Sequence, residues 1–416
     1  MGKEQALSPT PALEPRRGWG GFLLILLALV VEGFDLQAAN FAAPSIVEHF
    51  GIGRAEIGPL LSASLVGVLI GALTIGPLGD RLGRRTILIA CCVGYGLISL
   101  VAAFATSLGQ LIALRFLIGV GLGAVLPNAL ALAGELAPRR HLARAMGLVG
   151  IGISFGGVVA GAVAAQFLPL YGWPSLFIAG GLLPIAIALM LWIGLPESPA
   201  LAPADTPRDG ASGVRAILAP ERRAITLAIW ACFALVLMVV YLLSGWIPLL
   251  VKDQGYSTAA ASWIATGAHA GGVVGGIFAS LMLSRRSWSV VALFAGLAAV
   301  SLAIVALRDW GAVSLSLLLV MVGFFSTGTQ NGLNGSGGAT YPAGMRATGL
   351  GWALGMGRVG SILGPLVGSL ALLLGLHDPR SFFILPVVPL LIAAALALWL
   401  ARRTALPRST DRGEMS

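Results

Sequence analysis

The stretch "GPLGDRLGRR" (Gly76–Arg85) is a short polar turn between two long apolar runs, 57–79 and 86–106. It gathers four charged side chains within six residues: Asp80, Arg81, Arg84 and Arg85. Cytoplasmic loops of membrane proteins are enriched in Lys and Arg, which hold the helix ends on that side. The turn therefore predicts two membrane-spanning helices joined in the cytoplasm.

The same alternation of apolar runs and short polar turns extends along the whole chain. The 416 residues are 57% hydrophobic and only 10% charged, with mean hydropathy +0.92, whereas soluble domains carry about 25% charged residues. About 20 apolar residues suffice to cross a hydrocarbon core of roughly 30 Å. We predict twelve such spans, at 18–42, 57–79, 86–106, 108–132, 143–167, 172–194, 224–251, 258–282, 288–307, 311–336, 345–374 and 381–401.

The basic residues report the orientation of these spans. The net charge is +9, but it does not indicate a nucleic-acid partner, because nearly all Lys and Arg residues between spans fall on one side. With the amino terminus inside, the outer side holds only Arg54, Lys252, Arg308 and Arg380. This positive-inside bias places both termini in the cytoplasm.

The cysteines give no sign of a metal site or a disulfide framework. All three fall within spans: Cys91, Cys92 and Cys232. Free thiols in that position suit neither a secreted disulfide scaffold nor a zinc site. We expect no metal and no cofactor.

The spans divide into two related halves. The polar segment 196–223 separates six spans from six, and "RAMGL" at 144–148 recurs as "RATGL" at 346–350. Parallel repeats of this kind place a transporter's substrate site at their interface, near mid-membrane. We expect a cytoplasmic tail (1–17), a six-helix bundle (18–195), a cytoplasmic linker with one short surface helix (196–223), a second bundle (224–401) and a cytoplasmic tail (402–416). Glycines four residues apart, such as Gly67/Gly71 and Gly119/Gly123, predict close helix packing.

The turn motif Gly-x-x-x-Asp-Arg-x-Gly-Arg-Arg, with "RFLIGVGLG" (Arg115–Gly123) in the fourth span and "PESP" after the sixth, resembles the major facilitator superfamily. The resemblance implies an all-α membrane protein with twelve helices in two pseudo-symmetric six-helix bundles. It also implies that the loop braces a cytoplasmic gate between the halves. The gate residues would be Asp80, Arg81, Arg84, Arg85, Glu135, Arg144 and Arg346. The second-half turn "LMLSRRSW" lacks the Asp, which leaves its gate role open.

Within this superfamily, "EGFDLQAANFAAPSI" (Glu32–Ile46) resembles the first-helix signature of the aromatic acid:proton symporters. Their pattern is Asp-Gly-x-Asp, and this chain has Glu-Gly-x-Asp. "GVGLGAVLPNALAL" and "YLLSGWIPLLVKDQGY" are similar to the branch that carries 3-(3-hydroxyphenyl)propionate-type acids. The resemblance implies proton-coupled import of a (hydroxy)aromatic carboxylate by alternating access.

Glu32 and Asp35 interrupt an apolar span and are the candidate proton-coupling groups. They are three residues apart, about 60° around a helix, so we expect both on one face. A charged residue at the centre of a membrane helix costs on the order of 2.5–3.5 kcal/mol, so both should border a cavity. Desolvation and mutual repulsion favour the protonated form of a carboxyl group. The alternative is a fixed ion pair with an arginine inside the membrane.

Two arginines lie within spans, and a guanidinium grips a carboxylate through a planar fork. Arg358 is the candidate for the substrate carboxylate, and Arg115 for proton coupling or for pairing with an acid. Other polar side chains in the spans could bind hydroxyls or ring edges: Asn40, Tyr241, Trp246, His269, Gln330, Asn331 and Asn334.

Other functions fit less well. "GISFG" (Gly152–Gly156) matches the Gly-x-Ser-x-Gly motif of hydrolases, but Ser154 falls inside a predicted helix rather than at a strand-to-helix elbow, so we predict no enzyme. A drug or metabolite:proton antiporter of the same fold remains the alternative, although the fifth span lacks the Gly-Pro signature of that group. The acidic pair argues against a uniporter. We expect a monomeric multi-pass protein of a bacterial-type inner membrane, with the bilayer, protons and an aromatic carboxylate as its partners.

Overall fold

The computed structural model describes residues 15–136, 142–195, 210–282 and 287–404, and all regular structure in these ranges is helical. The first half comprises α1 (Pro15–Phe50), α2 (Ile57–Thr74), α3 (Gly79–Leu82), α4 (Arg84–Ala102), α5 (Leu108–Leu136), α6 (Leu142–Tyr171) and α7 (Pro174–Gly194). The second comprises α9 (Pro220–Asp253), α10 (Thr258–Met282), α11 (Ser287–Ala306), α12 (Ala312–Thr340), α13 (Arg346–Leu373), α14 (Pro379–Ile384) and α15 (Val387–Thr404).

The described residues contain twelve helical stretches that are long and apolar enough to cross a membrane, which confirms the twelve predicted spans. A helix suits this environment because it satisfies its own backbone hydrogen bonds where no water is available. The closely spaced runs at 86–132 are two helices, since α4 ends at Ala102 and α5 begins at Leu108. The short helix α8 (Gly210–Ile217) lies in the segment expected to link the halves.

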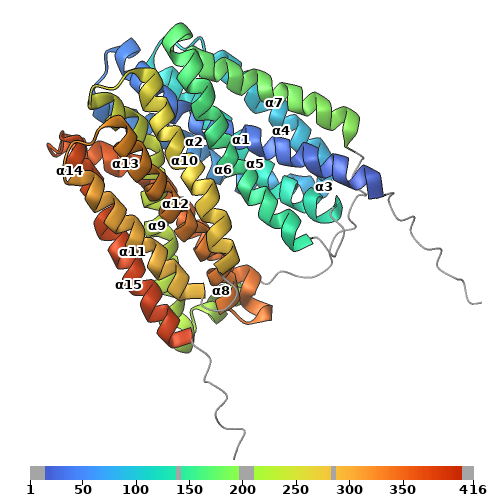
Figure 1. Cartoon of the computed structure of the whole chain (residues 1–416). Helices are drawn as coiled ribbons and strands as arrows, with labels where there is room; N and C mark the ends of the chain where they lie inside the picture. Colours follow the sequence, from blue (N-terminus) through green and yellow to red (C-terminus); the bar gives the residue numbers. More distant parts are fainter. Residues whose placement is uncertain (1–14, 137–141, 196–209, 283–286, 405–416) are drawn as a thin grey trace, which may run out of the picture.

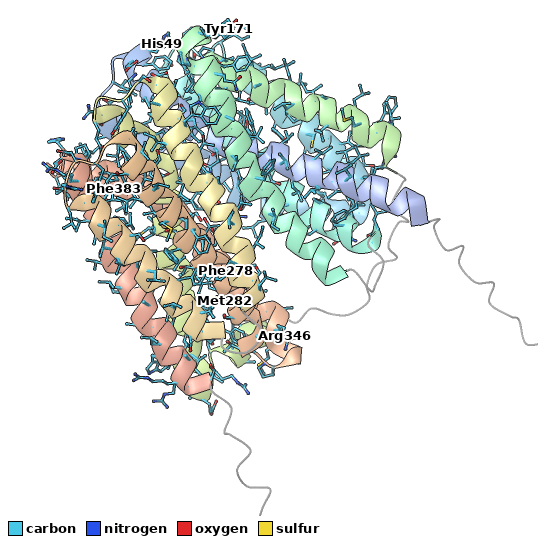
Figure 2. The ribbon with its side chains drawn as sticks, in the orientation of Figure 1. His49, Tyr171, Phe278, Met282, Arg346 and Phe383 are labelled. Carbon is cyan, nitrogen blue, oxygen red and sulfur yellow. The ribbon has the colours of Figure 1, made fainter. Side chains whose placement is uncertain are left out.

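The two halves form two groups of helices that diverge toward the ends carrying α3 and α8 (Figure 1). At the opposite ends they are joined by polar contacts. Arg54 forms an ion pair with Asp253 at 2.8 Å, and Lys252 forms one with Glu48 at 3.3 Å. Figure 2 shows His49 and Tyr171 at these joined ends and Arg346 at the separated ends. By the positive-inside assignment, the joined ends face outward.

Within each half, glycines let helices approach until backbone meets backbone. A Cβ at Gly71 of α2 would lie 2.0 Å from the Val120 carbonyl oxygen of α5, and one at Gly119 would lie 2.1 Å from that of Ser64. The second half repeats the arrangement, because a Cβ at Gly275 of α10 would lie 2.0 Å from the Phe324 carbonyl oxygen of α12. These contacts confirm the packing predicted from the glycine spacing.

We expect Gly119→Ala to lower the melting temperature of the purified protein, because overpacking a tight contact typically costs about 1–3 kcal/mol. Gly94→Ala is the matched control, since a Cβ at Gly94 meets no atom within 4 Å. Thermal unfolding of both variants in detergent measures the difference. Equal melting temperatures would contradict the assignment of Gly119 to a backbone contact.

Candidate functional site

A cavity of about 330 Å³ lies between the two halves, near the middle of α1 and α13. Its apolar wall comes from leucines, a valine and an isoleucine on both halves, and its polar lining from α1, α6, α9, α12 and α13. The polar members are Glu32, Ser154, Tyr241, Thr327, Gln330, Asn331, Asn334 and Arg358. The structure thus brings together six of the residues selected from the sequence, from four separate helices.

Glu32 and Arg358 are the two charged side chains that line this cavity. Glu32 is 3% exposed, and its Oε2 has no hydrogen-bond partner. Arg358 acts on it electrostatically, yet no ion pair within 4.0 Å joins them among the described residues. A buried carboxylate oxygen without a partner is costly, so this group is available to a proton, to water or to a solute.

Asp35 has a different environment, and the expectation that both carboxylates border one cavity is wrong for it. Its Oδ2 accepts a hydrogen bond from Arg115 Nη1 at 3.3 Å, and its carbonyl oxygen accepts another from Nη1 at 3.2 Å. Arg115 also donates to Ser64 Oγ at 3.0 Å. Asp35 is fully buried and Arg115 is 1% exposed. The 60° between positions 32 and 35 is enough to direct Asp35 into the first half, where it takes the alternative of an ion pair with an intramembrane arginine.

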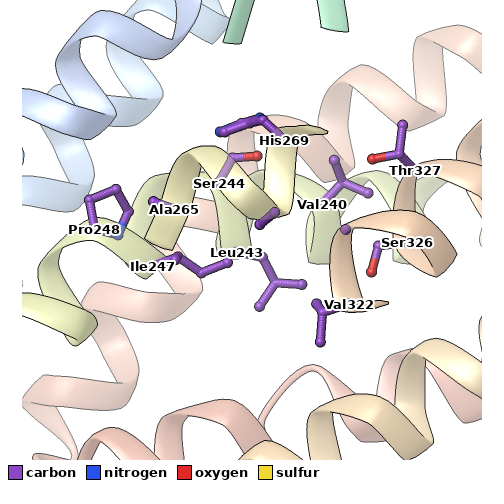
Figure 3. Close-up of a pocket in the computed structure, with 12 residues that line it drawn as sticks. Val240, Leu243, Ser244, Ile247, Pro248, Ala265, His269, Val322, Ser326 and Thr327 are labelled. Carbon is purple, nitrogen blue, oxygen red and sulfur yellow. The ribbon is translucent and has the colours of Figure 1, made fainter. Parts of the chain in front are cut away.

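His269 lines a smaller cavity of about 100 Å³ that adjoins the first and shares six of its lining residues. Gln37, Ser244 and Thr327 line it as well. A third cavity of about 40 Å³ continues from there toward the joined ends. Figure 3 shows His269 beside Ser244 in this third cavity, with Thr327 across from them.

Two of the expected substrate ligands do not line these cavities. Trp246 is fully buried, donates from Nε1 to the Pro365 carbonyl oxygen at 3.2 Å and packs on Phe382 at 5.2 Å between ring centroids. Asn40 is 7% exposed and donates to Gln37 Oε1 at 2.5 Å. Trp246 therefore holds α9 against α13, and Asn40 orients Gln37, which does line a cavity.

The charged turn lies at the separated ends of the halves. Arg84 pairs with Asp80 at 2.9 Å and also with Glu135 of α5, so three of the gate residues named from the sequence are in contact. Arg85 donates from Nη2 to the Trp192 carbonyl oxygen at 2.5 Å. Arg81 and Arg346 are exposed, and the side chain of Arg144 lies outside the described residues. These contacts of Arg84 and Arg85 lie within the first half, and a gating role stays a prediction.

Sequence reasoning missed Gln37, Ser244 and Thr327, and the two ion pairs that join the halves. The side chains are small or uncharged and resemble any polar residue on a helix. Arg54 and Asp253 could have been suspected as opposite charges on the same side of the membrane, but their pairing depends on how the halves meet.

Comparisons with known proteins agree with this architecture. The Major Facilitator Superfamily model matches residues 25–365. The chain is 38% identical to a gallate transporter of Pseudomonas putida, with 91% of each chain covered. It is 34% identical to a 4-hydroxybenzoate transporter of Pseudomonas aeruginosa, covering 95% of this chain and 94% of the relative. It is also 34% identical to a 3-(3-hydroxy-phenyl)propionate transporter of Escherichia coli (strain K12), covering 85% and 86%.

Among solved structures, a bacterial homolog of the human lysosomal transporter Spinster, described as inward-facing and unoccupied, has the same fold. The TM-score is 0.76 at 20% identity, covering 96% of this chain and 100% of that chain. The relatives are transporters, and Ser154 lies within α6, so the hydrolase interpretation is excluded. With a family match over most of its length and aromatic acid transporters among its relatives, the chain belongs to the major facilitator superfamily.

Proposed function

We propose that the protein imports a hydroxylated aromatic carboxylate together with protons, by alternating access across a bacterial inner membrane, as a monomer with both termini in the cytoplasm. The observation that carries this proposal is the cavity between the halves, which holds one acidic and one basic side chain, Glu32 and Arg358. Its volume of about 330 Å³ falls in the range of small-molecule sites.

The opposite charges of Glu32 and Arg358 in one cavity determine, in this proposal, whether a proton and a carboxylate help or oppose each other's binding. An ionised Glu32 offsets the field of Arg358 and repels an incoming carboxylate, whereas a protonated Glu32 leaves Arg358 free to attract it. Proton and anion then strengthen each other's binding, because coupling between two ligands is reciprocal. Cooperative binding favours symport, and an antiporter would require the two to compete.

The cavity lining suits a single aromatic ring with a carboxylate. Leucine side chains from α1, α5, α9 and α13 supply apolar walls, and a guanidinium presents a planar, bidentate fork. The names of the relatives, which include gallate and 4-hydroxybenzoate transporters, support the same class of substrate.

Alternating access is supported by where the halves touch. Besides the two ion pairs at the outer ends, Ser62 Oγ of α2 donates to the Ile362 carbonyl oxygen of α13 at 2.8 Å. The described side chains of the charged turn, at the opposite end, pair within the first half. This arrangement corresponds to an inward-facing state. Closing the inner ends over the cavity would bring the turn toward the second half.

In proteoliposomes, an outside-acid gradient should concentrate 3,4,5-trihydroxybenzoate inside. An inside-acid gradient should not, because symport moves the acid in the direction of proton flow. Protein-free liposomes control for passive entry of the neutral acid. Accumulation driven by an inside-acid gradient would instead identify an antiporter.

Substitutions of the two carboxylates, Glu32 and Asp35, should differ in their effect on the melting temperature. Glu32→Gln should abolish gradient-driven accumulation while leaving substrate exchange and the melting temperature near wild type, because only its cavity-facing charge is lost. Asp35→Asn should also abolish accumulation, but with a lower melting temperature. Breaking a buried pair leaves Arg115 uncompensated, at a cost of about 3–5 kcal/mol. Uptake and thermal unfolding measure both effects, and wild-type uptake by Glu32→Gln would remove that residue from coupling.

The outer ion pair should control which side of the cavity is open. Arg54→Glu would place a negative charge against Asp253, so labelling of a Ser244→Cys reporter by an impermeant maleimide added outside should rise several-fold. The native thiols are buried and give little background. The double variant Arg54→Asp/Asp253→Arg should restore low labelling.

Arg380→Glu is the matched control for that experiment. Arg380 pairs with Asp309 and Asp378 at the same ends of the molecule, but all three belong to the second half. Its reversal should leave labelling unchanged. If Arg380→Glu raised labelling as much as Arg54→Glu, a general charge effect would replace gating as the explanation.

A further inference from the structure

The cavity of about 100 Å³ beside His269 (here called the side cavity) differs in chemistry from the main cavity that holds Glu32 and Arg358. Its polar lining consists of neutral hydrogen-bonding groups: Gln37, Ser154, Tyr241, Ser244, Thr327 and Gln330, together with the imidazole of His269. Among the residues that the structure describes, no acidic side chain, lysine or arginine lines it. The two cavities share Leu36, Ile153, Ser154, Tyr241, Thr327 and Gln330, so they adjoin.

The side cavity lies on the outward, closed side of the main cavity. On α1 the main cavity is lined at positions 32 and 36, and the side cavity is lined in addition at 33 and 37. On α9 the main cavity is lined at 237 and 241, and the side cavity extends to 244. On α6 the lining passes from 153 and 154 to 157, and on α12 from 334 and 331 to 327. Each step runs toward the helix end at the joined side of the molecule. A solute that spans both cavities therefore has one end at Arg358 and the other deeper, toward the closed side.

His269 is held in place without using its hydrogen-bonding capacity. Its ring packs across Gly157 of α6, where a Cβ would come within 2.9 Å of Nδ1, and against Phe41 at 5.7 Å between ring centroids. Within the described residues, His269, Ser244 and Thr327 donate no side-chain hydrogen bond to protein and accept none. A neutral imidazole offers one N–H donor and one acceptor nitrogen, and each hydroxyl offers both functions.

From this geometry we infer that the side cavity is a subsite for the ring hydroxyl groups of the substrate, with His269 as a specificity-determining residue. The inference rests on the proposed function, since it takes the carboxylate to lie at Arg358. The ring then lies among the apolar side chains between the two cavities, and its meta or para hydroxyls reach His269, Ser244 and Thr327. An acid without hydroxyl groups makes no hydrogen bond to these side chains, which would then need water as a partner.

The test is a set of dissociation constants for benzoate, 4-hydroxybenzoate and 3,4,5-trihydroxybenzoate, measured by calorimetry on the full-length protein in nanodiscs. His269→Phe keeps the ring and its contacts with Gly157 and Phe41 but removes both nitrogens. His269→Gln retains a donor and an acceptor. His377→Phe, at an exposed position beyond the outer end of α13, is the matched control, and Arg358→Gln tests the carboxylate end.

We expect His269→Phe to weaken binding of the two hydroxylated acids about five- to tenfold, the usual effect of losing one hydrogen bond, and to change benzoate less than twofold. His269→Gln should recover part of the loss, and His377→Phe should change nothing. Equal weakening of all three acids by His269→Phe would mean that the residue only supports the fold, and unchanged binding of the hydroxylated acids would mean that it does not touch the ring. Either result overturns the subsite.

Failure of the proposed function would look different. If wild type bound none of the three acids, or if Arg358→Gln weakened none of them, the carboxylate site itself would be wrong, and the subsite would fall with it. Preferential loss of benzoate in His269→Phe would also overturn the subsite, because a contact with ring hydroxyl groups cannot produce it.

Discussion

A charge inside a membrane must be paired or must border a polar space, because an isolated ion in a low-dielectric surrounding carries a large desolvation penalty. This chain meets the constraint in two ways. Asp35 of α1 and Arg115 of α5 form an ion pair within the first half, and Arg115 also donates a hydrogen bond to Ser64 of α2. These contacts hold α1, α2 and α5 together. Glu32 and Arg358 face the space between the halves instead. Asp35 and Arg115 therefore belong to the interior of the first half, and Glu32 and Arg358 line the cavity that we propose as the substrate site.

The contacts between helices within each half can be compared with the contacts between the two halves. Inside each half, backbone meets backbone at glycines such as Gly119 and Gly275, and dispersion forces over such surfaces resist separation. Between the halves, two partly exposed ion pairs at the joined ends contribute only about 0–1 kcal/mol each. Helices of the two halves also pack closely at glycines, because a Cβ at Gly58 of α2 would lie 2.8 Å from the Pro365 carbonyl oxygen of α13 and one at Gly161 of α6 would meet Thr266 of α10. The proposed alternating access would therefore have to break the ion pairs at the joined ends and rearrange these helix contacts between the halves.

The spans could be predicted well from the sequence because hydropathy is a local property. The apolar character of one segment is enough to indicate that this segment can cross the bilayer. The family resemblance of the turn also grouped Glu135 with the charged residues of the turn, and Arg84 is the residue with which it pairs. Side-chain direction was harder to predict. Positions 32 and 35 differ by about 60°, and only the packing of α5 against α1 decides that Asp35 turns inward. Trp246 was expected in the pocket, yet it lies between α9 and α13, where its Nε1 donates a hydrogen bond to the carbonyl oxygen of Pro365. Gln37 and Ser244 gave no signal, because neutral polar side chains are common on helices.

The difference between paired and unpaired charges bears on how one cavity would serve both of the proposed roles, substrate binding and proton coupling. If both carboxylates faced the substrate, their combined charge would outweigh Arg358 and oppose an anion until both were protonated. With Asp35 neutralised by Arg115, the proposed coupling depends on a single cavity carboxylate, whose protonation switches the net charge of the lining from neutral to positive. In the proposed mechanism, affinity for a carboxylate would follow the protonation of Glu32, and the neutral groups near His269 would discriminate among rings without changing the charge of the cavity.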